Sequence, residues 1–182
     1  MNKQAKVLRA EKLYDRYNSA YEYELQMPSQ KSGVEFGEPV LREMLHTNDS
    51  VFVLIHAVDI DSFVLVREFR TGIFFNEGDD DPFLISCVAG AMDKGKSPED
   101  TARAEVMEEA GLEAGDLHHI ATAYASPGRM TEKTHLFYTQ VKGVPQTGSF
   151  GVARRASRAR ATASGASGSG SLKAMFLATV VE

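Results

Sequence analysis

Residues 90–112 constrain the fold of this chain more than any other stretch, because they contain a glycine-containing loop followed by strong signals for a capped helix. Ser97 is a typical N-cap, Pro98 suits the first helical position, and Asp100 stands where a capping box places an acid. Apolar residues recur every fourth position, at Ala102, Val106 and Ala110. We therefore predict a helix that begins at Pro98, ends before Gly111 and packs one face on a core.

Three glutamates lie along one edge of this predicted helix. Glu105 and Glu109 are four residues apart and share a face, and Glu108 lies beside them. Like charges at this spacing destabilise a helix by a few tenths of a kcal/mol, so a bound cation would offset a real cost. Mg²⁺ takes oxygen ligands and keeps several waters, so a few carboxylates and substrate phosphates suffice to hold it. A solvated acidic face is the alternative, and the spacing alone does not decide between the two.

The same residues resemble a Nudix box. The pattern of that family is Gly, five residues, Glu, seven residues, Arg-Glu, an aliphatic, any residue, Glu-Glu, any residue, Gly and an aliphatic. The positions that match in register are Gly90, Glu105, Val106, Glu108, Glu109, Gly111 and Leu112. Lys96 departs from the pattern where its first Glu belongs, and Ala104 departs where its Arg belongs. In the family these two positions carry opposite charges that brace the loop against the helix, so the resemblance implies that this brace is lost.

The resemblance extends beyond the box, over roughly residues 5–142. Residues 63–70 are similar to the strand before the box in the ADP-ribose and GDP-mannose pyrophosphatase branch, and residues 126–132 resemble the loop after it. The implied fold class is α/β, a Nudix α/β/α sandwich with a mixed sheet and an N-terminal β subdomain. The residue pattern agrees with this fold, because β-rich stretches surround one predicted helix. The predicted strands are 6–14, 20–26, 38–46, 51–58, 63–69, 83–89, 118–125 and 135–141.

We divide the chain into four parts on these grounds. They are an N-terminal β arm and candidate dimerisation element at 1–46, a Nudix core at 47–142, a linker-like segment rich in Arg, Ala, Ser and Gly at 143–171, and a C-terminal element at 172–182 that packs on the core. Residues 152–171 hold no acid and no aromatic residue, so they cannot bury enough surface to offset the entropy of ordering them. A frame-shifted or rebuilt segment is our hypothesis for this stretch.

The resemblance also implies a site. The helix carboxylates Glu105, Glu108 and Glu109 would be the catalytic residues and would bind Mg²⁺ or Mn²⁺ together with the backbone carbonyl of Ala89. Arg70 would pair with a substrate phosphate, a task that suits a guanidinium fork. Arg67 is a second candidate for substrate binding, but it shares a strand face with Arg70 only if a bulge intervenes.

Two functions remain open at this point. One is Mg²⁺-dependent hydrolysis of the diphosphate bond of a nucleoside diphosphate sugar such as ADP-ribose or GDP-mannose, with impaired activity. The impairment is expected because Lys96 and Ala104 depart from the box, Ser86 stands where relatives often carry Glu, and no acid occurs between Glu132 and Glu182. The alternative is a catalytically inactive Nudix-fold module that binds a nucleotide or a protein.

Bulk properties bound the partners. A net charge of −5 argues against a nucleic-acid partner, and no apolar run reaches membrane-spanning length. Cys87 is the one cysteine, which fits the reducing cytoplasm. The partner is therefore expected to be a small nucleoside diphosphate derivative. We also expect a homodimer built through the first forty residues, whose apolar strand side chains are Val7, Leu8, Leu13, Tyr21, Tyr23 and Leu25.

Overall fold

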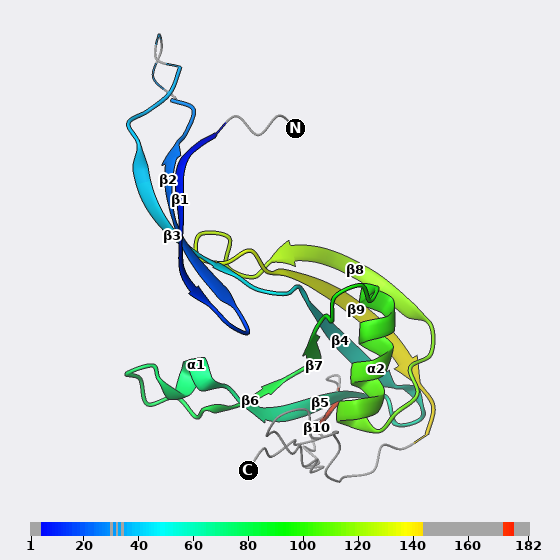
Figure 1. Cartoon of the computed structure of the whole chain (residues 1–182). Helices are drawn as coiled ribbons and strands as arrows, with labels where there is room; N and C mark the ends of the chain where they lie inside the picture. Colours follow the sequence, from blue (N-terminus) through cyan, green and yellow to red (C-terminus); the bar gives the residue numbers. More distant parts are fainter. Residues whose placement is uncertain (1–4, 30, 32, 34, 144–172, 177–182) are drawn as a thin grey trace. The chain divides into compact units, whose positions relative to one another are not determined.

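The computed structural model describes residues 5–29, 31, 33, 35–143 and 173–176, and these residues form two compact units (Figure 1). Within the described residues, the first unit comprises 5–49 and 123–133, and the second comprises 50–122, 134–143 and 173–176. The segment 123–133 thus belongs with the N-terminal strands although it is distant in sequence. The predicted linker at 143–171 lies outside the described residues except for Gly143.

The first unit is built on an antiparallel sheet in the order β1-β2-β3. Its strands are β1 (Lys6–Asp15), β2 (Ser19–Gln26) and β3 (Val40–His46). Alternating polar and apolar residues favour such strands. Every residue of β1 is exposed, including the large apolar side chains of Val7, Leu8 and Leu13. The unit therefore has an edge strand with uncovered apolar side chains.

The second unit is built on a mixed sheet in the order β10-β5-β4-β9-β8, with β6 added to β5 and β7 added to β4 (Figure 1). The β4/β9 and β10/β5 pairs are parallel, and the β4/β5, β4/β7 and β5/β6 pairs are antiparallel. The strands are β4 (Ser50–Ala57), β5 (Ser62–Phe69), β6 (Phe83–Ser86), β7 (Val88–Ala91), β8 (Leu117–Tyr124), β9 (Lys133–Val141) and β10 (Lys173–Phe176), and the short helical turns are η1 (Val58–Ile60) and α1 (Thr71–Phe74). The predicted α/β class with a mixed sheet and an N-terminal β subdomain is confirmed.

The helix α2 (Pro98–Ala110) packs against this sheet, mainly on β4 and β7. Its predicted caps are present, because Ser97 Oγ accepts a hydrogen bond from Asp100 N at 3.1 Å and Gly111 adopts a left-handed φ of 64°. Its predicted apolar stripe is buried as well. The core that it covers consists of valines and other apolar side chains, among them Val51, Val53, Ile55, Val64, Val66, Val88 and Phe137. Burying each such side chain contributes about 1.5–3 kcal/mol, so this packing holds α2 in place.

The strand expected at 83–89 is wrong as a single element. The chain instead forms β6 and β7, separated at Cys87, and the two strands pair with different neighbours. β6 continues the sheet beyond β5, whereas β7 lies along β4. A continuous apolar run cannot reveal such a change of partner, because both pieces are partly buried strands. The C-terminal element expected at 172–182 contains a strand over Lys173–Phe176, and the residues that follow it lie outside the described part of the chain.

Among the described residues, no helix combines the length and the apolar composition that crossing a membrane requires.

Candidate active site

Glu105 and Glu109 both reach from α2 to the strand β7. The Glu105 side chain lies directly over Gly90, where a Cβ atom would overlap its carboxyl carbon and stand 2.6 Å from its Cγ. Glu109 Oε2 accepts a hydrogen bond from Ala89 N at 3.3 Å. The two carboxylates that helical spacing placed on one face therefore meet consecutive residues of one strand. Glycine at position 90 is required by this close approach rather than by its backbone dihedrals.

Glu109 lies in an environment that opposes its ionisation. The pKa of the Glu109 carboxyl is raised to about 8, mainly by burial and also by the negative charges of Glu68 and Glu105. The hydrogen bond from Ala89 N and the charge of Arg70 lower that pKa, but they do not compensate. In the absence of a cation, this carboxyl therefore retains a proton near neutral pH. A cation that bound there would favour the charged form and displace the proton.

Glu68 completes this acidic cluster, and the sequence analysis did not single it out. Val64 and Val66 are fully buried on β5, and Glu68 continues the same alternating row. Burial raises the pKa of Glu68, and Arg70 opposes that effect. The sequence signal that could have identified Glu68 is the strand alternation, because Glu68 follows the core-facing Val64 and Val66 at the same two-residue spacing.

The two candidate substrate-binding arginines occupy different surroundings. Arg70 Nη2 forms an ion pair with Glu68 Oε2 at 2.9 Å. Arg67 Nη2 instead pairs with Asp81 Oδ2 at 2.6 Å, and its guanidinium lies over the ring of Phe83 at 4.8 Å. The β5/β6 register runs without a shift from Val66 to Phe69, so no bulge follows Arg67 within β5, and Arg70 lies beyond β5 as the N-cap of α1. Arg70 is thus the arginine beside the acidic cluster.

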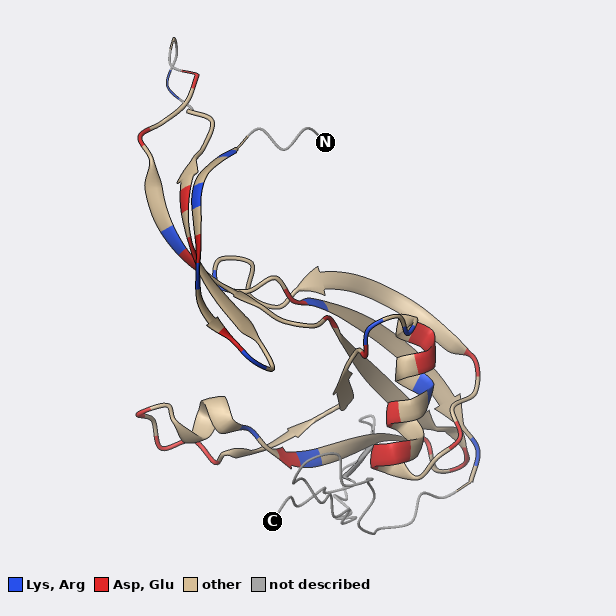
Figure 2. Cartoon of the chain, in the orientation of Figure 1, with Lys and Arg blue, Asp and Glu red and all other residues tan. Residues whose placement is uncertain are grey.

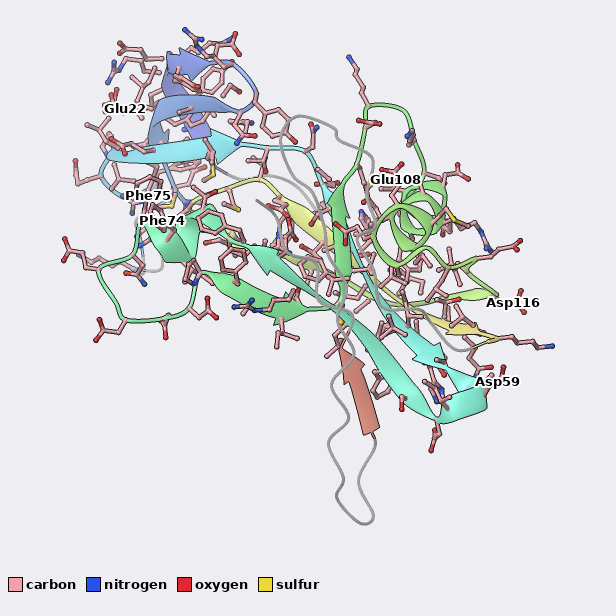
Figure 3. All side chains as sticks on the ribbon, turned by 90° about the horizontal axis from the view of Figure 1, so that it is seen from below. Glu22, Asp59, Phe74, Phe75, Glu108 and Asp116 are labelled. Atoms are coloured by element: carbon pink, nitrogen blue, oxygen red, sulfur yellow. The ribbon has the colours of Figure 1, made fainter. Side chains whose placement is uncertain are left out.

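Figure 2 shows acidic positions along α2, and Figure 3 labels Glu108 on that helix. Glu108 is partly buried.

Figure 3 also labels Phe74 and Phe75 at α1. The rings of these two residues lie 5.1 Å apart and are exposed. The neighbouring α1 is a single helical turn that follows Arg70.

The positions that depart from the Nudix box have local partners of their own. Lys96 Nζ forms an ion pair with Asp93 Oδ2 at 3.1 Å within the loop before α2. Ala104 lies within α2 and offers no charge to that loop. Ser86 Oγ donates a hydrogen bond to the Cys87 carbonyl at 3.1 Å, and burial raises the pKa of the Cys87 thiol. Cys87 therefore has the properties of a core thiol rather than of a nucleophile.

The donor chemistry of this cluster fits a hard cation. Its side chains supply carboxylate oxygens, the ligands that Mg²⁺ and Mn²⁺ prefer, and the mutual repulsion of Glu68, Glu105 and Glu109 is of the kind that a cation relieves. Within the described residues, no three His, Cys, Asp or Glu side chains are already gathered as a ligand set. Glu105, Glu108, Glu109 and the Ala89 carbonyl therefore stay candidate ligands.

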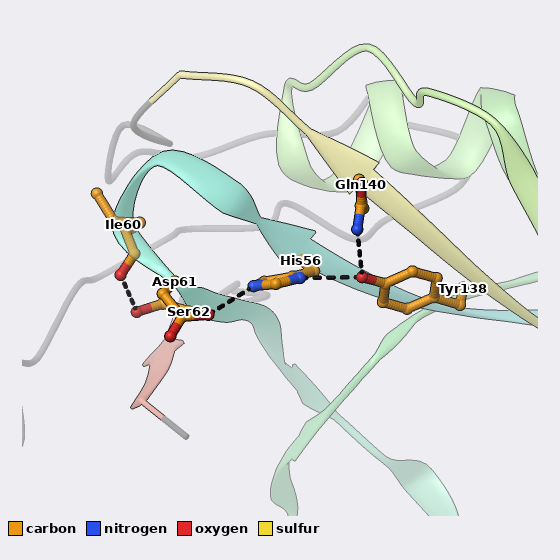
Figure 4. A network of polar contacts seen from close by, with 6 residues as sticks. All are labelled: His56, Ile60, Asp61, Ser62, Tyr138 and Gln140. Atoms are coloured by element: carbon orange, nitrogen blue, oxygen red, sulfur yellow. Dashed lines mark hydrogen bonds and ion pairs between the residues drawn. The ribbon is translucent and has the colours of Figure 1, made fainter. Parts of the chain in front are cut away.

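A second polar cluster lies on the same sheet but lacks the features of a catalytic site (Figure 4). His56 Nδ1 is 2.9 Å from the Tyr138 hydroxyl and its Nε2 is 3.0 Å from Asp61 Oδ1, so both ring nitrogens are engaged. Gln140 Nε2 donates to the same Tyr138 oxygen at 3.0 Å. The Ser62 hydroxyl donates to the Ile60 carbonyl within the turn and is not directed at His56. The cluster joins β4, β9 and the η1 turn, which is a structural role.

The histidine pair His118 and His119 likewise provides no joint site. The ring of His118 lies near Tyr138, and the ring of His119 lies near Phe137. Since neighbouring strand residues point to opposite faces, the two imidazoles lie on opposite faces of the sheet, as the alternation predicts.

Comparison with known proteins places these observations in a family. A family model described as the NUDIX domain matches residues 46–159. An ADP-ribose pyrophosphatase of Haemophilus influenzae is 35% identical over 115 residues, which cover 63% of this chain and 53% of that protein. A GDP-mannose pyrophosphatase of Klebsiella pneumoniae is 34% identical over 110 residues, which cover 60% of this chain and 54% of that protein. The chain thus spans about half the length of these relatives.

A solved structure described as an ADP compounds hydrolase has the same fold. It aligns with a TM-score of 0.59 at 20% identity and covers 78% of this chain and 71% of that chain. At that identity the likeness concerns the fold alone.

Proposed function

This chain belongs to the NUDIX family, and we propose that it hydrolyses the diphosphate bond of a nucleoside diphosphate sugar such as ADP-ribose or GDP-mannose. The observation that carries the proposal is the convergence of Glu105 and Glu109 on Gly90 and Ala89, with Arg70 beside them. This arrangement places carboxylates that can bind a metal cation next to an arginine that can bind a phosphate. A diphosphate substrate requires both. The names of the two relatives support the same substrate class.

In this proposal the helix carboxylates Glu105, Glu108 and Glu109, with the Ala89 carbonyl, hold Mg²⁺ or Mn²⁺. Bound there, the cation supplies charge neutralisation for the phosphates and a lowered pKa for the attacking water. Arg70 places its guanidinium against a phosphate and neutralises charge that develops on the departing group. Water adds its oxygen to one phosphorus, the bridging P–O bond breaks, and the products are a nucleoside monophosphate and a sugar phosphate.

Arg67 is the weaker of the two candidate substrate ligands. Its guanidinium is engaged by Asp81 and Phe83, so recruitment to substrate would require it to leave both contacts. Its effect on substrate binding is therefore expected to be smaller than that of Arg70.

We further propose that turnover is low compared with a relative that keeps the full Nudix box. Lys96 is paired with Asp93, and Ala104 cannot provide the arginine of the family brace. Ser86 and the stretch between Glu132 and Glu182 lack carboxylates that relatives of this branch often carry. A missing general base typically lowers a rate by about 10²–10⁴-fold.

The competing function is a Nudix-fold module that binds a nucleotide or a protein without turnover. The same departures at Lys96, Ala104 and Ser86 favour it. For the hydrolase we retain a small nucleoside diphosphate substrate, a homodimer built through the first forty residues and a cytoplasmic setting as parts of the proposal.

The test is release of nucleoside monophosphate from ADP-ribose and from GDP-mannose, with Mg²⁺, with Mn²⁺ and with chelator. Metal-dependent release that is absent from Glu109→Gln supports the hydrolase. The matched control is Glu113→Gln, which changes an exposed glutamate after α2. Tight binding of either nucleotide without release would support the binding module instead.

A further inference from the structure

The carboxylate of Glu68 stands where the alternation of β5 would ordinarily place an apolar side chain. Val64 and Val66 precede it in the row that faces the core, and both are buried. A carboxylate that is largely removed from water costs free energy unless a partner compensates it. The compensating partner explains why an acid is tolerated here.

That partner is Arg70, and the geometry of the pair is informative. Glu68 Oε2 lies 2.9 Å from Arg70 Nη2, yet this buried oxygen accepts no hydrogen bond from any described residue. The contact is therefore one of charge rather than of a directed N–H bond. A guanidinium carries five N–H donors, so an anchor of this kind can hold the group in place while its donors remain for a ligand.

The charge of Glu68, which holds Arg70 in place, also affects the neighbouring carboxylates of α2. The negative charge of Glu68 is one of the causes that raise the pKa of Glu109. A residue that served packing alone would not need a charge at this point. Arg67 is less suited to the role of the anchored arginine, because its own guanidinium pairs with Asp81.

We propose that Glu68 is a positioning residue, whose carboxylate holds the Arg70 guanidinium beside the carboxylates of α2 so that Arg70 presents its N–H donors to the diphosphate. This inference rests on the proposed function, because Arg70 is there the phosphate ligand. Glu68 acts through Arg70 and contacts neither the substrate nor the cation.

The first experiment is a double-mutant cycle on binding, measured by calorimetry with ADP-ribose and with GDP-mannose in a buffer that contains chelator. Glu68→Ala is expected to weaken binding by about threefold to tenfold, the range that corresponds to immobilising one long side chain. Glu68→Gln keeps the size of the side chain but removes its charge, so it should weaken binding by a similar factor. In an Arg70→Ala background, Glu68→Ala should have no further effect. Glu113→Ala is the control and should bind as the parent does.

Two outcomes of this cycle would overturn the inference. One is an equal effect of Glu68→Ala with and without Arg70. The other is tighter binding in Glu68→Ala, which would mean that repulsion of the diphosphate dominates. A separate Mn²⁺ titration without chelator gives a third: an equal loss of Mn²⁺ affinity in Glu68→Ala and Glu68→Gln would make Glu68 a cation ligand.

A second measurement needs no ligand and also covers failure of the proposed function. With ¹⁵N-labelled arginine, the Nε–H order parameter of Arg70 should be high in the parent and low in both Glu68→Ala and Glu68→Gln, because both substitutions remove the charge that anchors the guanidinium. Arg16, which is exposed in the turn between β1 and β2, is the internal reference for a guanidinium at the surface. If neither nucleotide binds, the proposed function fails while this comparison still decides the inference. Equal order parameters for Arg70 in the parent and in Glu68→Ala would overturn it.

Discussion

The carboxyl group of Glu105 occupies the space that a side chain at Gly90 would need. The residues are fifteen positions apart in the chain, and their contact joins the loop end of β7 to the middle of α2. The contact explains why glycine stands fifteen positions before Glu105, since a Cβ atom at position 90 would push the Glu105 carboxylate away.

Gly90→Ala should therefore impair the site more than the fold. Glu105 is a flexible side chain and can rotate away, so the thermal midpoint should fall only slightly. Its carboxylate would leave the cluster, and Mn²⁺ affinity should fall by roughly tenfold, as when a supporting residue of a metal site is lost. Calorimetric Mn²⁺ titration and thermal circular dichroism test both parts. Gly72→Ala is the control, because nothing lies within 4 Å of a Cβ built there.

Glu109→Gln should abolish hydrolysis and lower Mn²⁺ affinity by at least about ten- to hundredfold. Gln keeps the size of the side chain and its ability to accept from Ala89 N, so the fold should persist. Calorimetry with Mn²⁺ measures the change against Glu113→Gln. An unchanged affinity would show that Glu109 is not a cation ligand.

The stability of the metal-free protein should decrease as pH rises from about 4.5 to about 8. The folded-state pKa of Glu109 is raised to about 8, so the folded protein retains a proton there that the unfolded chain has lost. With fewer protons bound in the unfolded state, the free energy of unfolding falls with pH in this window. Urea unfolding of the parent and of Glu109→Gln in chelator, at several pH values, tests this. The decrease should be smaller in the variant, and parallel profiles would contradict the assignment.

Restoring the family brace should raise turnover. Lys96→Glu and Ala104→Arg together are expected to increase the rate by more than the two single changes combined, because the proposed pair acts as a unit. A misplacement of about 1 Å can cost roughly a hundredfold, which sets the scale of the gain. Lys94→Glu makes the same charge change nearby in the loop and serves as control. Equal rates for the double variant and the parent would exclude the brace as the limiting defect.

The first unit should mediate a homodimer. Its strand β1 exposes Val7, Leu8 and Leu13, and an uncovered apolar edge strand favours pairing. Light scattering at micromolar concentration should give about twice the chain mass of 19.9 kDa. Leu13→Glu should shift the protein towards monomer without unfolding it, whereas Ile120→Glu, at an exposed position of β8, should not. A parent that scatters as a monomer would refute the prediction.

The sequence by itself determined the local elements. The caps at Ser97 and Gly111 and the four-residue apolar stripe set the bounds of α2, because these signals act within a few residues. The same spacing placed Glu105 and Glu109 on one face. The alternating stretches predicted most strands to within one or two residues.

Only the tertiary structure decided which charges meet. Glu68 and Glu109 are distant in sequence, and the raised pKa of Glu109 arises from burial, from Glu68 on β5 and from Glu105 on α2 itself. The break at Cys87 arises because β6 pairs with β5 whereas β7 pairs with β4. The sequence does not reveal this change of partner, because both strands have the same kind of apolar pattern. Strand alternation already separated Arg67 from Arg70, but only the tertiary structure showed that Arg67 pairs with Asp81 and Arg70 with Glu68. Packing between distant segments sets burial, register and electrostatic environment, so the sequence could name the helix glutamates and Arg70 but neither Glu68 nor the electrostatic environment in which these side chains act.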